Sequence, residues 1–100
     1  MGKETKEVIF KPQAIKSIQA ISQYIAYKGY RETAENFAGR LYSFAESLAI
    51  FPEKYPVCRF VKLAKRMMRC AIFEQNYVFI YKRVEHSLTI FNVIHCRALK

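Results

Sequence analysis

The chain has 100 residues, of which 52% are hydrophobic and 25% are charged. This length provides for one hydrophobic core and excludes a second domain, and the composition excludes an intrinsically disordered protein. The chain has seventeen Lys and Arg and eight acidic residues, all of them Glu, which gives a net charge of +9. We therefore expect a single basic domain over residues 1–100. Its positive charge predicts an anionic partner.

The first elements are a tail, a short strand and a helix. Residues 1–7 are polar and mixed in charge, which predicts a flexible tail and not a signal or transit peptide. Residues 8–10 (VIF) predict a short strand, which ends before Pro12 because the fixed φ of proline suits the first turn of a helix. From Pro12 to about Lys28, isoleucines recur every three or four residues and form one apolar stripe. They are Ile15, Ile18, Ile21 and Ile25.

A second helix is predicted from Arg31 to Phe51. Gly29 supplies a stop for the first helix, Glu32 suits the first turn of the second, and Pro52 lies just beyond its end. The apolar residues that share one face are Ala34, Phe37, Ala38, Leu41, Ala45 and Leu48. The short link between the helices predicts an antiparallel hairpin.

After Pro56 the pattern changes to short runs rich in Val, Ile, Phe and Tyr, which are typical of strands. The predicted strands are Cys58 to Leu63, Arg69 to Glu74, Tyr77 to Arg83 and Leu88 to His95. Residues 75–76 and 85–87 are links short enough for antiparallel hairpins. A strand, two helices and a β-meander indicate an α+β fold with both helices on one face of a single sheet.

The second face of this sheet is also expected to be apolar. In the last predicted strand, Leu88, Ile90 and Ile94 point one way, whereas Phe91 and Val93 point the other. Two helices cannot cover both faces, so we expect an exposed apolar patch, which in a small protein is typical of a binding surface. The alternatives are helices that wrap further round the sheet, or a homodimer.

Cysteine and histidine usage argues against a metal site. Cys58, Cys70 and Cys96 form no C-x-x-C pair, and their odd number argues against a complete disulfide framework and indicates a reducing, cytoplasmic location. His86 and His95 lie on either side of the last predicted strand, away from other ligands. No cofactor motif is present, and the longest apolar run is too short to span a membrane.

The positive charge lies mainly in the second half of the chain. Residues 1–50 carry seven bases and five Glu, whereas residues 51–100 carry ten bases and three Glu. This asymmetry favours nucleic acid, an acidic protein segment or a membrane surface as the partner, with a solvated basic face as the alternative. The candidate binding residues are Arg59, Lys65, Arg66, Arg69, Arg83, Phe91, Val93 and Arg97.

Some of these residues could also support ribonuclease chemistry. Cleavage would need a base for the 2′-hydroxyl, an acid for the leaving oxygen and cations for the phosphorane charge. His95 could be the acid or base, Arg69 and Arg97 could hold the phosphate, and Tyr81 or Lys62 could assist in proton transfer. A His at the end of a strand is also typical of a structural residue, so no catalytic residue is assigned.

Two segments, residues 69–81 (RCAIFEQNYVFIY) and 88–97 (LTIFNVIHCR), together resemble the RelE/ParE toxin superfamily. The helical half agrees, because residues 14–25 and 34–52 look like the helical hairpin of that superfamily. The likeness covers about residues 8–97. It implies a two-helix hairpin packed on an antiparallel sheet.

The resemblance implies the toxin of a bacterial type II toxin-antitoxin module, which acts in plasmid stabilisation and growth inhibition. Such toxins form hetero-oligomers with an antitoxin whose acidic, partly disordered tail crosses the toxin surface. RelE-like members cut mRNA on the ribosome, whereas ParE-like members poison DNA gyrase without a known catalytic step of their own.

The end of the chain separates these branches. RelE-like members generally use several basic residues plus a late Tyr or His-Tyr ending, but this chain ends Arg97-Ala98-Leu99-Lys100. The long hairpin and the His95-x-Arg97 ending are more similar to the ParE branch, which implies gyrase as the target. The alternatives are a RelE-like mRNA endoribonuclease and a non-toxic protein-binding module.

Overall fold

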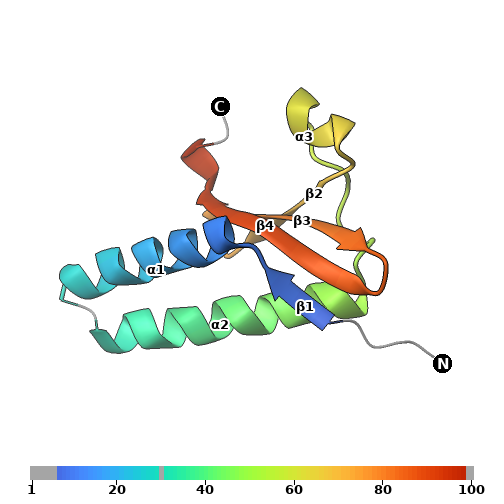
Figure 1. Cartoon of the computed structure of the whole chain (residues 1–100). Helices are drawn as coiled ribbons and strands as arrows, with labels where there is room; N and C mark the ends of the chain where they lie inside the picture. The colour runs from blue at the N-terminus through green and yellow to red at the C-terminus, as the bar shows by residue number, and fades with distance from the viewer. Residues whose placement is uncertain (1–6, 30, 99–100) are drawn as a thin grey trace.

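Two long helices pack against one face of a four-stranded sheet in the computed structural model, which describes residues 7–29 and 31–98 (Figure 1). In chain order the elements are β1 (Glu7–Phe10), α1 (Pro12–Tyr27), α2 (Arg31–Ile50), α3 (Val61–Lys65), β2 (Arg69–Phe73), β3 (Tyr77–Val84), β4 (Ser87–His95) and the 3-10 helix η1 (Cys96–Ala98). The predicted α+β architecture is confirmed. The predicted tail lies outside the described residues except for Glu7, which begins β1.

The helical hairpin follows the apolar spacing of the sequence. In α1, Ile18 of the predicted stripe is buried together with Ala14, and Ile21 and Ile25 are half-buried, but Ile15 is 39% exposed. The predicted face of α2 is buried except for the half-buried Ala38. Between the helices, the N–H of Gly29 donates to the carbonyl oxygen of Ala26 (2.9 Å), and Gly29 has a φ of 93°. Glycine adopts this backbone conformation without a steric penalty, so the predicted helix stop at Gly29 is confirmed.

The sheet has the strand order β1-β4-β3-β2. The neighbouring pairs of the meander are antiparallel, whereas β1 is parallel to β4. The N–H of Lys11, after the end of β1, donates to the carbonyl oxygen of Ile90 (2.9 Å). The start of the chain therefore lies beside the last strand, and both helices follow from there over one face of the sheet.

A β-bulge in β4 changes which side chains face the helices. Ile80 pairs with Asn92 and Tyr81 pairs with Ile90, so Phe91 is the extra residue. Beyond the bulge the alternation is reversed, and Val93 joins Ile90 in the core beneath the helices with 1% of its surface exposed. The predicted directions of Val93 and Ile94 are therefore wrong, because strict alternation holds only in a strand without a bulge, and Ile94 packs on the outer face with Phe91.

The predicted strand from Cys58 to Leu63 is also wrong. Val57 makes an isolated antiparallel bridge with Arg69, and residues 61–65 form the short helix α3. This helix ends with bonds from the N–H of Met68 to the Leu63 oxygen (3.1 Å) and from Met67 to Ala64 (2.9 Å). A short apolar run fits a helix or a strand equally well, and only the surrounding structure decides between them.

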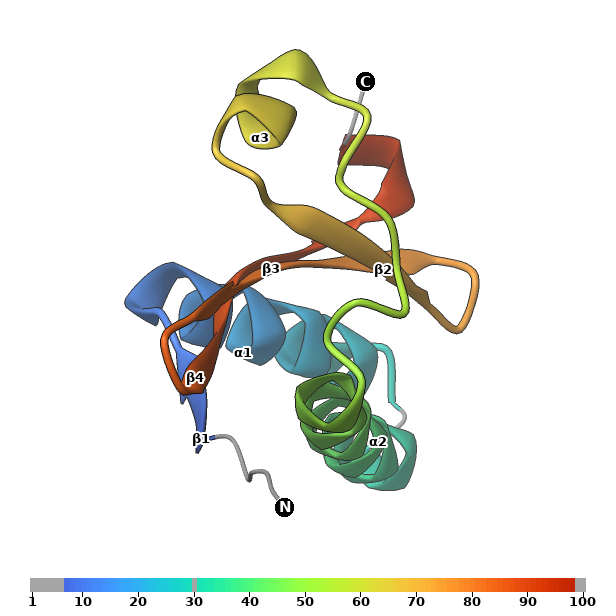
Figure 2. The ribbon, with the colours of Figure 1, turned by 90° about the vertical axis from the view of Figure 1, so that its right-hand side faces the viewer.

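Residues 57–68, here called the covering segment, lie over the sheet face opposite α1 and α2 (Figure 2). Cys58 and Met68 of this segment pack with Val78 and Ile80 of β3, and each of the four is at most 6% exposed. The expectation of a bare second face is therefore wrong. The segment that was expected to extend the sheet covers it instead, and Ile72 on β2 remains exposed (59%).

A disulfide joins Cys58 to Cys70, with their Cα atoms 5.0 Å apart, and Cys96 is a free thiol. Two of the three cysteines are thus paired, a pairing that their spacing in the sequence does not predict. The cause is tertiary, because the bridge between Val57 and Arg69 brings the residues that follow each of them together. Among the described residues no helix has the length and apolar character for crossing a membrane, and no three His, Cys or acidic side chains gather as metal ligands.

Candidate partner-binding surface

The covering segment contains most of a run of basic residues, which we call the basic loop, residues 59–69 (RFVKLAKRMMR). It carries five cations and no acid. They are Arg59, Lys62, Lys65, Arg66 and Arg69. None of the residues of α3 is buried, so the cations of this helix are directed into solvent at the far side of the sheet from the long helices.

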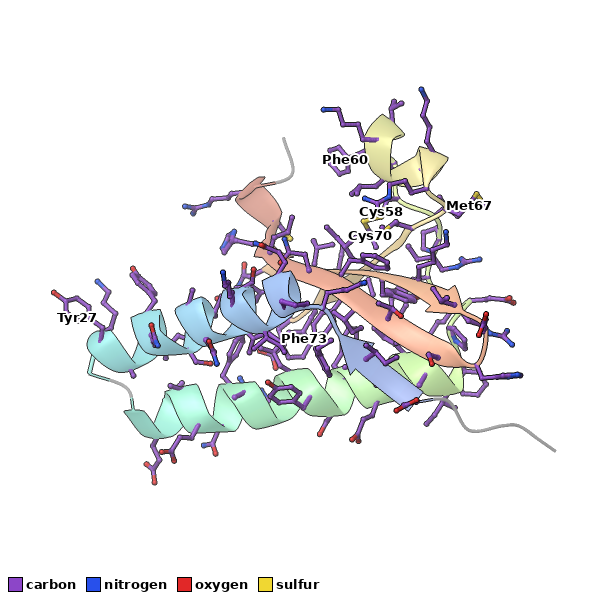
Figure 3. All side chains as sticks on the ribbon, in the orientation of Figure 1. Tyr27, Cys58, Phe60, Met67, Cys70 and Phe73 are labelled. Atoms are coloured by element: carbon purple, nitrogen blue, oxygen red, sulfur yellow. A yellow bond between two sulfur atoms is a disulfide. The ribbon has the colours of Figure 1, made fainter. Side chains whose placement is uncertain are left out.

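Apolar side chains are exposed among these cations. Phe60 is 38%, Val61 is 66% and Met67 is 62% exposed. Figure 3 shows Phe60 and Met67 on opposite sides of the segment that carries α3. A surface that combines exposed apolar groups with cations suits a partner that has both apolar and acidic groups.

Phe91 connects the basic loop to the sheet. The Nζ atom of Lys11 and the guanidinium of Arg66 each lie 5.6 Å from the centre of the Phe91 ring. Cations are attracted to the negative face of an aromatic ring, so the bulged Phe91 holds two positive charges from distant parts of the chain. This arrangement raises the positive potential beside α3 and favours an anion there.

The side chains of Arg69 and Tyr81 lie away from the exposed cations of α3. Both face the helix side of the sheet, where the guanidinium of Arg69 donates to the carbonyl oxygen of Tyr55 and the hydroxyl of Tyr81 donates to that of Pro52 (2.8 Å). Tyr81 has no exposed surface. Burial raises the pKa of Tyr81 to about 12, and the nearby Arg69 charge opposes this shift. Both side chains therefore hold the chain after α2 in place.

His95 is the last residue of β4, and Arg97 follows it in η1. His95 pairs with Tyr77, and its ring lies edge-on to the Tyr77 ring at a centroid distance of 5.4 Å. The backbone N–H of Arg97 donates to Nδ1 of His95 (3.1 Å), while the Arg97 side chain is exposed. Lys62 is on α3. The five candidates for ribonuclease chemistry thus occupy three places and do not surround one phosphate position.

The binding candidates also divide. Arg59, Lys65 and Arg66 lie on the basic loop, and Phe91 lies beneath Arg66. Arg83 borders a shallow depression with Phe51 and Lys54 at the end of α2, away from the basic loop. Lys11 was not a candidate, because its place over Phe91 depends on the parallel pairing of β1 with β4, for which the sequence holds no local signal.

A family model described as "ParE toxin of type II toxin-antitoxin system, parDE" matches residues 8–99. The chain belongs to the ParE toxin family. The ParE branch of the predicted superfamily is therefore confirmed.

A solved structure has the same fold as this ParE-family chain. It is the "Chromosomal ParDE TA system from P. aeruginosa", with a TM-score of 0.76 and 10% sequence identity. The match covers 91% of this chain and 96% of that chain. A comparison with curated proteins found no match.

The buried tyrosine of this ParE-family fold provides a test of the contacts behind the site. Replacing Tyr81 by Phe should lower the free energy of unfolding by about 1 kcal/mol at neutral pH, because the Pro52 carbonyl loses its donor. The wild type should lose further stability as the pH rises from about 10, where an unfolded tyrosine ionises, towards about 12. Below the unfolded pKa this contribution is fully present. The variant should lack this alkaline loss.

Urea unfolding of both proteins between pH 7 and pH 11.5 measures the difference. Tyr24→Phe is the matched control, because Tyr24 is 62% exposed and its phenol should contribute little. Equal stabilities of wild type and Tyr81→Phe at neutral pH, with parallel losses above pH 10, would contradict the structural role of this hydroxyl.

Proposed function

We propose that this chain inhibits bacterial growth by acting on DNA gyrase, and that an acidic antitoxin neutralises it. The observation that carries the proposal is the match of the ParE toxin family over residues 8–99. The fold agrees with that of a ParDE system, which supports a toxin that forms a hetero-oligomer with its antitoxin. The proposed place of action is the cytoplasm, where gyrase works.

The basic loop is the proposed antitoxin surface. An extended antitoxin segment with alternating acidic and apolar residues could place carboxylates on Arg59, Lys65 and Arg66 and apolar groups on Phe60 and Met67. A disordered acidic tail that orders on binding has this chemistry. Because the chain covers its own sheet face, such a tail would lie on the loop and not on bare strands.

The exposed Arg97 extends this proposed surface. It follows β4, whose residues Phe91 and Ile94 belong to the cluster beneath the covering segment. Phe91 remains a proposed contact, because it is half-buried and carries two cations. Val93 does not belong to the proposed surface, since its side chain is buried beneath the helices.

Binding to gyrase is favoured over mRNA cleavage by the positions of the candidate catalytic groups. Tyr81 is buried with a high pKa, and it lies on the other side of the sheet from Lys62. His95 on β4 pairs with Tyr77 on β3, whereas Tyr81 of β3 pairs with Ile90. His95 and Tyr81 are therefore separated along the sheet. General acid-base catalysis needs its groups within hydrogen-bond reach of one substrate position. A toxin that acts by binding has no such requirement.

Induced expression in bacteria tests the proposal. We expect growth arrest, and we expect co-expression of the antitoxin from the neighbouring gene to relieve it. The purified chain should inhibit supercoiling by gyrase and leave cleaved DNA. In translation extracts the mRNA should stay intact. Codon-periodic cuts in that mRNA would show that the target is the ribosome and not gyrase. Normal growth at high expression of folded protein would remove the toxin proposal altogether.

A further inference from the structure

The Cys58–Cys70 disulfide closes a ring around the basic loop. The two cysteines are separated by 12 positions, and the residues between them include the five cations and helix α3 (Figure 3). Cys58 is buried and Cys70 is half-buried, and both belong to the cluster on the outer face of the sheet. The disulfide therefore ties the whole loop to β2 at one point.

Besides the disulfide, few buried side chains hold the loop, because Met68 is the one fully buried residue among residues 59–69. Helix α3 has five residues, none of them buried, and no side-chain cap at its N-terminus. A helix this short is not stable on its own. Apart from the disulfide, a hydrogen bond from the N–H of Cys58 to the Met68 oxygen (2.8 Å) holds the loop, and the side chains of Met68 and Leu63 pack on the outer face of the sheet. Arg66 also lies over the Phe91 ring, and Arg69 bonds to the Tyr55 oxygen and forms the bridge with Val57.

The main core does not depend on this fastening. Phe79, Leu41 and the other residues beneath α1 and α2 form a cluster separate from that of Cys58, Met68, Val78 and Ile80. Loss of the disulfide should consequently open the outer face and leave the helices packed on the inner one. Proteins open locally where few buried contacts hold a segment.

We propose that the Cys58–Cys70 disulfide is a redox-controlled clamp. In the oxidised chain it holds the basic loop over the sheet, and in the reduced chain the loop opens and uncovers Val78 and Ile80. The reductant is a dithiol. In this way the disulfide would also regulate antitoxin binding, and this part of the proposal rests on the proposed function, because the clamped loop is the proposed antitoxin surface. The opening itself is a property of the chain alone.

The reaction is a thiol-disulfide exchange. One thiolate of the reductant attacks Sγ of Cys70, the more exposed of the two cysteines, and forms a mixed disulfide while the Cys58 thiolate leaves and takes up a proton. The second thiolate of the reductant then closes its own disulfide and releases Cys70, which is also protonated. Two electrons pass to the chain, and the dithiol becomes a disulfide.

Hydrogen exchange of the intact chain tests the clamp. The oxidised wild type, the wild type in excess dithiothreitol and the Cys58→Ser/Cys70→Ser double variant are compared by mass spectrometry. Without the disulfide, the amides of Cys58, of residues 64–68 and of Cys70 should exchange about 100-fold faster, as expected from the closure entropy of a loop of this length. The amides of α2 and β4 should keep their protection.

The Cys96→Ser variant is the matched control, because Cys96 is a free thiol in the same cluster. It should exchange like the oxidised wild type. Unchanged exchange in the loop after reduction would overturn the proposal. Equally faster exchange of the α2 amides would also overturn the proposal, since the disulfide would then stabilise the whole fold and not the loop alone. Three titratable free thiols in the air-oxidised chain would also overturn the proposal, because the disulfide would then be absent.

These readouts need neither an antitoxin nor toxicity. Faster exchange confined to the loop, in a chain that does not arrest growth, would keep the clamp and remove the toxin proposal. Growth arrest together with unchanged exchange would do the reverse. The dithiothreitol arm also keeps the test valid if the double variant does not fold.

Discussion

Replacing Phe79 by Ala should lower the free energy of unfolding by about 3 to 5 kcal/mol. Phe79 has no exposed surface, and its ring centre lies 5.0 Å from that of Phe44 and 5.8 Å from that of Phe73. The truncation would leave a cavity in the aromatic cluster that joins α2 to the sheet. Small domains have total stabilities of about 5–15 kcal/mol, so this single change should remove a large part.

Urea unfolding followed by circular dichroism measures this loss. Phe79→Leu keeps most of the volume and should cost about 1–2 kcal/mol, which gives a value even if the Ala variant does not fold. Ile72→Ala on the neighbouring strand is the control, because its side chain is 59% exposed and should change stability by less than about 0.5 kcal/mol. Similar losses for Phe79→Ala and Ile72→Ala would show that this core is assigned wrongly.

The helices and the meander could be predicted from sequence because their burial repeats along the chain. In α2, the predicted apolar face is buried from Ala34 to Leu48 except for Ala38, which is half-buried. Gly29 marks the turn by its conformational freedom, and the runs in β3 and β4 are long enough to favour strands. Each of these signals lies within the element that it predicts.

Two features depend on partners elsewhere in the chain. The bulge at Phe91 arises from the register between β4 and β3, and one extra residue is enough to turn Val93 into the core. The covering segment adopts its helix because Met68 and Cys58 find apolar partners on β3. Neither interaction has a signature within residues 57–68 or within β4.

The candidate surface, too, could be predicted from sequence only in part. Charge alone pointed to Arg59, Lys65 and Arg66, because cations without nearby acids in sequence stay exposed together when they lie on one loop. The separate position of Arg69 follows from strand parity, since it pairs with Tyr81 on the helix side. Sequence identifies which residues are charged, and the sheet decides which of them share a surface.

Reversing three charges of the basic loop should weaken antitoxin binding by about 100-fold or more. The variant is Lys62→Glu, Lys65→Glu and Arg66→Glu, all at exposed positions of the loop. The proposed partner segment is acidic, so each attraction becomes a repulsion between like charges. The effect should shrink as salt is raised, because exposed charges are screened within about 10 Å at 0.1 M ionic strength. Titration calorimetry with the purified antitoxin at two salt concentrations measures it.

The matched control reverses Lys16, Lys28 and Lys54, which are also exposed but lie outside the loop. It changes the net charge by the same amount and should reduce affinity only modestly. Equal weakening by both variants would mean that the antitoxin senses net charge and not this surface. Unchanged affinity of the loop variant would place the antitoxin elsewhere. If the loop is the surface, growth arrest by the loop variant should persist when the antitoxin is co-expressed, because the toxin would no longer be neutralised.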